Sequence, residues 1–112
     1  MLDKNLLSLW VPTHERCGVI LNDGTIKELV NLSECPAKEF RMDLDSAGVP
    51  KQDIIASWHT HCHGSANLSV DDYAGFQAQP ELEHYVVGKD EVWRYIVDGT
   101  KVYLYDDETG SF

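Results

Sequence analysis

The sequence is poor in basic side chains: nine Lys and Arg residues stand against nineteen Asp and Glu residues, which gives a net charge of −10. This imbalance disfavours binding to nucleic acid phosphates and to anionic membrane surfaces. The chain also lacks an apolar run near the ~20 residues that a membrane-spanning helix needs. Its first residues show neither the basic flank nor the long apolar stretch of a secretory signal. We therefore expect a cytoplasmic protein with no nucleic acid or membrane partner.

Cysteine is also scarce, and its three positions follow no zinc-finger spacing. Cys17, Cys35 and Cys62 form an odd set, which argues against a disulfide framework and favours a reducing compartment. Cys17 and Cys35 are typical of small, buried apolar positions. With 112 residues, of which 43% are hydrophobic, the chain suits one globular domain over residues 1–112, with a frayed tail from about residue 106.

Hydrophobic periodicity and turn signals predict two helices and a series of short strands. The helices are expected over residues 2–10 and from Ser69 to Pro80. The strands are expected over residues 17–21, 26–30, 40–44, 54–58, 83–87, 92–97 and 101–105. Turns at Asn22-Asp23-Gly24 and Asp98-Gly99 join antiparallel pairs. The pattern predicts an α/β or α+β domain with a mainly antiparallel sheet flanked by helices.

Two of these elements show a distinct side-chain pattern. Phe40, Met42 and Leu44 alternate with charged residues, which is typical of a half-exposed strand. In the helix after Ser69, four residues share one helical face: Val70, Tyr73, Ala74 and Gln77.

The stretch from Trp58 to Asp72 carries the most chemistry. His59 and His61 stand two residues apart at the end of an apolar strand, so their imidazoles point to the same side. Ser69 and Asp72 stand three residues apart at a helix start and share a helical face. If the intervening loop returns the helix over the strand end, Asp72 completes a set of two histidines and one carboxylate. Such a set suits catalytic zinc, which keeps an open position and lowers the pKa of water to about 7.

A zinc hydrolase also needs a general base, and Glu15 is the best candidate. It precedes the apolar strand 17–21, so it lies at the mouth of the sheet rather than inside it. A carboxylate there can take a proton from water and pass it to a leaving amine. Ser69 is a candidate donor to the oxyanion of the tetrahedral intermediate, an interaction worth about 3–4 kcal/mol.

These residues also have structural interpretations. The run Ser69-Val70-Asp71-Asp72 fits a helix capping box, and Glu15 fits a solvated residue at a strand edge. Cys62 offers a thiol between two histidines, but adjacent strand residues point apart, which disfavours a Cys-His nucleophile. Three further histidines are interpreted as loop, exposed or core residues: His14, His63 and His84.

The stretch from His59 to Asp72 resembles the H-x-H-x7-S-x2-D signature of the JAMM (MPN+) zinc metalloprotease family. Residues 15–20, Glu-Arg-Cys-Gly-Val-Ile, are similar to the glutamate segment of that family. The resemblance covers most of the chain and is closest to the small JAMM domains of bacteria and of phage tail-tip assembly proteins. It implies a JAMM/MPN-like, cytidine-deaminase-like fold.

By this resemblance, His59, His61 and Asp72 hold zinc, Glu15 is the general base and Ser69 is the oxyanion donor. The implied activity is hydrolysis of a peptide or isopeptide bond. The implied partner is a protein or peptide substrate, with a phage tail protein or a ubiquitin-like modifier as candidates. A phage-encoded domain would act in the host cytoplasm or in the virion tail.

The sequence departs from the family pattern in three places. Cys62 stands where proline usually follows the second histidine, His63 adds an imidazole, and Asp71 adds a carboxylate at the wrong spacing. The long insertions that grip ubiquitin have no room between these motifs. One alternative is a phage tail-tip assembly or binding module with a structural or vestigial metal site, closed by Cys62 or His63. Another is deubiquitinase-like removal of a small modifier.

Overall fold

The computed structural model describes residues 2–34, 40–62, 64–67 and 69–104. The expected frayed tail, Cys35 and His63 lie outside these residues. Within them the elements follow in this order: α1 (Leu2–Leu7), β1 (Cys17–Leu21), β2 (Ile26–Leu29), η1 (Leu44–Ala47), η2 (Lys51–Asp53), β3 (Ile54–Thr60), α2 (Val70–Ala78), β4 (Glu83–Val87), β5 (Val92–Asp98) and β6 (Lys101–Leu104). None of the helices in the described ranges is long and apolar enough to cross a bilayer.

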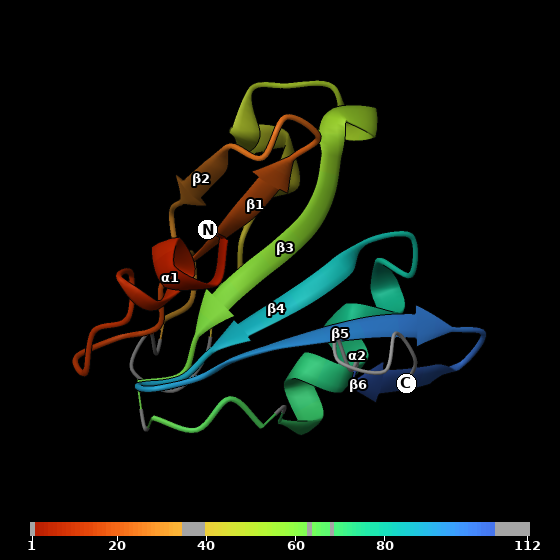
Figure 1. Ribbon diagram of the computed structural model, residues 1–112. Coiled ribbons are helices and arrows are strands. Elements are labelled where there is room, and N and C mark those ends of the chain that lie inside the picture. The colour runs from red at the N-terminus through yellow and green to blue at the C-terminus, as the bar shows by residue number, and fades with distance from the viewer. Residues whose placement is uncertain (1, 35–39, 63, 68, 105–112) are drawn as a thin grey trace.

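The strands form one six-stranded sheet in the order β2-β1-β3-β4-β5-β6 (Figure 1). All neighbours are antiparallel except β3 and β4, which run parallel and are connected through α2. The predicted hairpins β1–β2 and β5–β6 are confirmed. The fold is therefore of the mixed α+β class, with a mainly antiparallel sheet, as the sequence pattern predicts.

Side chains of β3 alternate between two buried faces of the sheet. Ala56 and Trp58 pack with Leu6 of α1 in one apolar cluster. Ser57 and His59 occupy the alternate positions, and Phe76 of α2 lies near the His59 ring, with centroids 6.1 Å apart. The two helices thus cover opposite faces, as Figure 1 shows. The face under α2 carries the polar residues.

Gly18 is required by the close packing of three strands. A Cβ atom there would lie 2.0 Å from the carbonyl oxygen of Lys27 and 2.8 Å from the Trp58 ring. Both contacts are far inside van der Waals distance. The glycine next to Cys17 therefore lets the Trp58 ring pack closely against β1, which pairs with β3.

The expected strand over residues 40–44 is wrong. Leu44 instead begins the 3-10 helix η1, because the Asp43 side chain caps it by accepting the Asp45 N–H at 3.0 Å. Met42 and Leu44 pack against an apolar cluster that includes Val19. The alternation of apolar and charged residues therefore reflects a loop with one buried side rather than a paired strand.

The two helices also differ from the expectation in detail. The α1 helix ends at Leu7, about one turn before Trp10, and tight i to i+3 turns complete the segment. In α2, Tyr73 is exposed, whereas Asp72 and Phe76 are buried. Ala74 and Gln77, expected to share the face of Tyr73, are exposed as well. The buried face thus contains a carboxylate that hydrophobic periodicity does not mark.

Candidate metal centre

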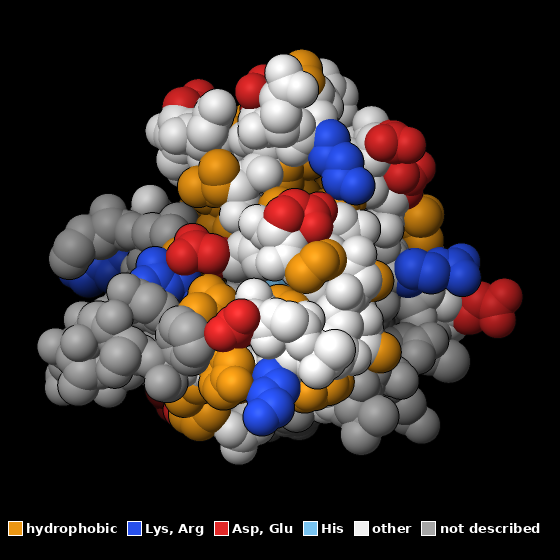
Figure 2. Space-filling model, turned by 90° about the vertical axis from the view of Figure 1, so that its right-hand side faces the viewer, with side chains coloured by type: hydrophobic (Ala, Val, Ile, Leu, Met, Phe, Trp, Pro, Cys, Tyr) orange, Lys and Arg blue, Asp and Glu red, His pale blue; other side chains and the backbone are white. Residues whose placement is uncertain are grey.

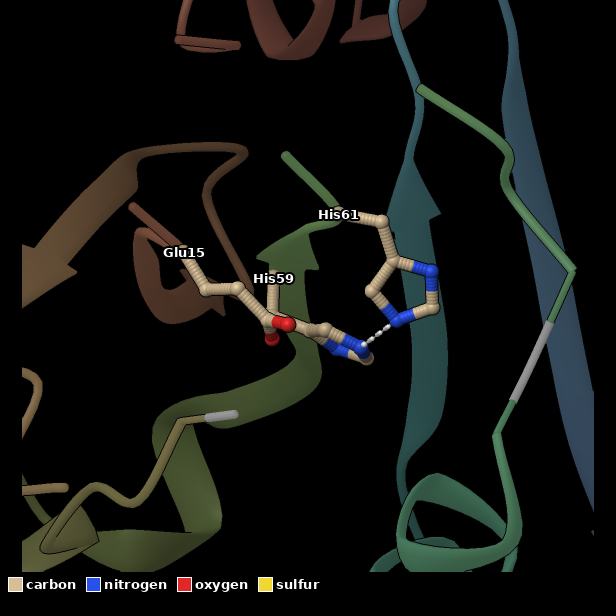
Figure 3. A group of neighbouring side chains, drawn as sticks. All are labelled: Glu15, His59 and His61. Carbon is tan, nitrogen blue, oxygen red and sulfur yellow. Dashed lines mark hydrogen bonds between the residues drawn. The ribbon is translucent and has the colours of Figure 1, made fainter. Parts of the chain in front are cut away.

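The pairing of β1 with β3 brings Glu15 beside the two histidines of the motif. Cys17 lies opposite His59 in the antiparallel register. The pairing continues past the strand end, because the Thr60 N–H donates to the Arg16 carbonyl at 2.8 Å and the Arg16 N–H donates to Thr60 Oγ1 at 2.8 Å. Glu15, one residue further, is buried at 4% exposure. Figure 3 shows its carboxylate directed toward the His59 ring.

One ligand atom from each of Glu15, His59 and His61 lies within 4.8 Å of the others. This group of three can hold a metal ion. The Nε2 atoms of His59 and His61 are 3.0 Å apart (Figure 3). The two histidines therefore converge on one point, as their i, i+2 spacing predicts.

Asp72 joins the histidines because the helix begins with a capping box. The Ser69 hydroxyl accepts the Asp72 N–H at 3.1 Å, and the Asp72 carboxylate accepts the Ser69 N–H at 3.0 Å. The same carboxylate lies 3.0 Å from His59 Nε2 and 2.8 Å from His61 Nε2. The structural interpretation of the Ser69–Asp72 run is thus confirmed, and it is the cap that holds the carboxylate against the imidazoles.

The protonation of His61 follows from its neighbours. Its Nδ1 lies 3.0 Å from the Ser65 carbonyl oxygen, which can only accept, so Nδ1 carries a proton and Nε2 is the ring nitrogen directed at the cluster. The Trp10 indole N–H donates to the His61 carbonyl at 2.7 Å. Both ends of the residue are therefore fixed, and Nε2 faces Asp72 and His59.

His59 is held by packing rather than by a hydrogen bond at its second nitrogen. Its ring stacks on Phe40, with centroids 4.1 Å apart. Its Nδ1 makes no hydrogen bond within the part of the chain that the structure describes. The stack with Phe40 and full burial leave the imidazole little freedom to rotate.

Burial and mutual charge decide the titration of the cluster. Burial lowers the pKa of His59, against the opposing influence of Asp72. Burial also lowers the pKa of His61. The hydrogen bond to Asp72 and the negative charges of Asp72 and Glu15 outweigh burial, so the pKa of His61 is raised overall. The Asp72 carboxyl is itself buried, yet its hydrogen bonds to both histidines hold its pKa well below the ordinary range. The carboxylate is therefore charged at neutral pH.

The donor set fits a divalent ion. Imidazole nitrogens and carboxylate oxygens are the zinc ligands of catalytic sites, with metal–ligand distances of about 2.0–2.2 Å. Tetrahedral ligands at that distance stand about 3.3 Å apart, close to the 2.8–3.0 Å between the Nε2 atoms and the Asp72 oxygens. These atoms need a proton or a cation among them, because lone pairs otherwise face each other.

Each sequence-predicted site residue lies in this region. Glu15, His61, Ser69 and Asp72 line one cavity of about 710 Å³, and His59 contacts two of them. Ser69 caps α2 through its hydroxyl oxygen, which accepts the Asp72 N–H. Its O–H proton is not used by that bond and can still be donated.

The remaining cysteines and histidines separate into distinct environments. Burial, with the charges of Glu28 and Glu15, raises the pKa of the Cys17 thiol to about 12, so it stays protonated. Its buried position is as expected. Cys62 is half-buried and does not belong to the candidate metal-ligating group among the described residues.

His84 is a core histidine that also lines the cavity, together with Ser57. Sequence patterns missed this pair because it forms only when β4 lies beside β3.

Comparison with known proteins informs the fold alone. Neither models of known families nor curated proteins give a match to the chain. Among solved structures, the chain is similar to the solution structure of protein DSY2949 from Desulfitobacterium hafniense, with a TM-score of 0.67 and 19% identity. The similarity covers 90% of this chain and 83% of that one. The overall fold is thus shared with a protein of distant sequence.

Proposed function

We propose that the protein is a zinc-dependent peptidase or isopeptidase of the JAMM type, with the JAMM/MPN variant of the α+β fold. One observation carries the proposal: two Nε2 atoms and a carboxylate converge within 3.0 Å, and Glu15 belongs to the same buried group. The residues of the cluster are those of the H-x-H-x7-S-x2-D pattern and its upstream glutamate.

His59, His61 and Asp72 are the residues that would hold zinc. Bound there, zinc would polarise the scissile carbonyl and lower the pKa of a water molecule to about 7. The chain itself supplies the proton transfers. The Glu15 carboxylate takes a proton from the attacking water and gives it to the departing amine nitrogen. Its burial strengthens that role, because charges act over longer range where water is excluded.

Ser69 stabilises the negative charge that develops on the carbonyl oxygen. Its oxygen is engaged by the Asp72 N–H, which orients the hydroxyl, while its proton remains available for donation. The substrate lies extended along the β2 edge and gains main-chain hydrogen bonds by strand addition. β2 is an edge strand, and Asn31, just beyond it, donates to the Glu15 carbonyl at 2.9 Å. The edge therefore leads to the general base.

Exchange of Glu15 for glutamine tests the proposal. Glu15→Gln keeps the shape of the side chain and removes its basicity, so zinc content should be unchanged while turnover falls about 10²–10⁴-fold. Turnover is measured on zinc-loaded protein with a peptide library and with an isopeptide-linked dimer of a ubiquitin-like modifier. Glu34→Gln is the matched control, because Glu34 is an exposed glutamate that lines the same cavity.

Full activity in Glu15→Gln, or an equal loss in Glu34→Gln, would remove Glu15 as the base. Zinc binding without hydrolysis of either substrate class would favour the assembly module instead. Cleavage of the dimer alone would favour removal of a modifier, and cleavage of peptides alone would favour a peptidase, for instance one acting on a phage tail protein.

A further inference from the structure

The polar row of the candidate metal centre continues along β3 beyond the histidines. Ser57, His59 and His61 occupy alternate positions, and His84 lies opposite Ser57 on the parallel strand β4. Ser57 Oγ and His84 Nδ1 are 2.6 Å apart. Both residues are buried, at 6% and 2% exposure, and both line the cavity that also contains Asp72. A group bound at the metal centre can therefore extend to this pair.

The direction of the hydrogen bonds in the pair is determined by its outer partner. His84 Nε2 lies 3.0 Å from the Gln79 carbonyl oxygen, which only accepts, so Nε2 carries a proton. Burial lowers the pKa of His84 to about 4, so the ring is neutral at pH 7 and Nδ1 is an acceptor. The Ser57 hydroxyl therefore donates to Nδ1. Its oxygen keeps two lone pairs, and the cavity floor is a hydrogen-bond acceptor.

The walls next to this floor are aromatic and aliphatic. Phe76 stacks on the His84 ring with centroids 4.3 Å apart and an interplanar angle of 10°. Met42, Leu44 and Leu82 line the same cavity. The charges that line it come from the metal centre and from two exposed residues, Glu34 and Arg41. This part of the cavity thus combines a neutral hydrogen-bond acceptor at its floor with apolar walls.

This combination selects among possible occupants. A carboxylate cannot donate to Ser57 Oγ, and an ammonium group would be desolvated at the floor with no counter-charge from Ser57 or His84. A purely apolar ring would leave the acceptor unsatisfied. An uncharged ring that ends in a donor satisfies both the walls and the floor. Such groups also pack well against Phe76 in offset or edge-to-face arrangements.

We propose that this part of the cavity is a specificity subsite for a tyrosine side chain, whose ring packs beside Phe76 and whose hydroxyl donates to Ser57 Oγ. The cavity of about 710 Å³ is within the range that encloses a small ligand. The inference rests on the proposed function only for the peptide nature of the ligand. The preference for a ring that carries a hydrogen-bond donor follows from the Ser57–His84 pair.

Binding of single-residue probes to the intact chain tests the subsite without requiring hydrolysis. The probes are N-acetyl-tyrosine amide, N-acetyl-phenylalanine amide and N-acetyl-lysine amide, titrated while the His84 ring resonances are followed by NMR. The tyrosine probe should bind about tenfold more tightly than the phenylalanine probe, as expected for one buried hydrogen bond. The lysine probe should bind most weakly. Ser57→Ala should abolish the difference between tyrosine and phenylalanine, and Ser8→Ala, at an exposed serine outside the cavity, should preserve it.

Equal affinities for the tyrosine and phenylalanine probes in the wild type, or tightest binding of the lysine probe, would overturn the proposal. The wild-type comparison is decisive even where Ser57→Ala does not fold. A tyrosine preference in a protein that hydrolyses nothing would leave the subsite intact and refute only the peptidase. Hydrolysis without any tyrosine preference would support the peptidase and refute the subsite.

Discussion

Replacement of Asp72 tests whether one carboxylate both caps the N-terminus of α2 and completes the candidate metal centre. In Asp72→Ala the helix loses the side chain that accepts the Ser69 N–H at 3.0 Å, and both ion pairs to His59 and His61 disappear. Loss of a helix cap costs about 1 kcal/mol, and loss of hydrogen bonds to a charged group costs about 1.5–3 kcal/mol. We therefore expect the metal-free variant to lose about 2–4 kcal/mol of unfolding free energy.

Asp72→Asn separates the two roles. The amide oxygen can still accept the Ser69 N–H, so the cap survives and the loss of stability should be about 1 kcal/mol smaller than in Asp72→Ala. The amide is neutral and is not among the usual zinc ligands. Both variants should therefore lose zinc affinity by more than the roughly 10–100-fold that removal of a ligand's hydrogen-bonding partner costs.

Urea unfolding in the presence of a chelator measures the stabilities, and competition with a zinc-binding dye measures the affinities. Asp90→Ala is the control, because it removes one exposed carboxylate outside the cavity and should change neither quantity. If Asp72→Asn is as unstable as Asp72→Ala, the account of the cap is refuted. If Asp72→Asn binds zinc as tightly as the wild type, Asp72 is not a ligand.

Two further predictions concern the sheet and the buried histidine. Gly18→Ala should destabilise the fold by about 3 kcal/mol or prevent folding, because the new methyl group overlaps the Lys27 carbonyl and the Trp58 ring; urea unfolding measures this, and a change below 1 kcal/mol would contradict the packing. His84 has a pKa lowered from 6.5 to about 4 by burial, so the unfolded chain binds more protons between these values and stability should fall as pH drops from 6.5 to 4. The difference between the two pKa values corresponds to about 3 kcal/mol of unfolding free energy. Unfolding free energies measured across this range should therefore fall more steeply for the wild type than for His84→Gln, and parallel curves would rule out the neutral buried histidine.

Much of the fold follows from local sequence signals. Both predicted hairpins are present. The first turns at Asn22-Asp23-Gly24 as expected, whereas the second turns at Gly99 and Thr100, one residue after the expected start, because Asp98 still pairs with Lys101. The strand over residues 40–44 was predicted from alternation alone. Alternation does not show whether a partner strand exists, and here the Asp43 cap turns the chain into η1 before a strand can pair.

The residues of the candidate site were predictable from the sequence, but the contacts that hold those residues in place were not. The spacing of His59, His61 and Asp72 is visible in the sequence because strand and helix periodicities place them. The stack of Phe40 on His59 and the Ser57–His84 hydrogen bond arise from contacts between distant segments. No local pattern encodes such contacts.

The excess of acidic residues does not form one continuous patch on the face shown in Figure 2. Acidic side chains on the face shown in Figure 2 are scattered among polar and hydrophobic ones, and almost no histidine surface is visible there. Buried His59, His61 and His84 agree with this view. The candidate ligands Glu15, His61 and Asp72 line the cavity.

Zinc titration of chelator-treated protein, followed by calorimetry and elemental analysis, tests the central claim most directly. We predict one zinc ion per chain, binding with release of protons near neutral pH because the imidazoles must be deprotonated. His59→Ala should abolish this binding, whereas His14→Ala, at an exposed histidine, should retain it. Absence of zinc from the wild type, or an equal zinc content in His59→Ala, would contradict the account.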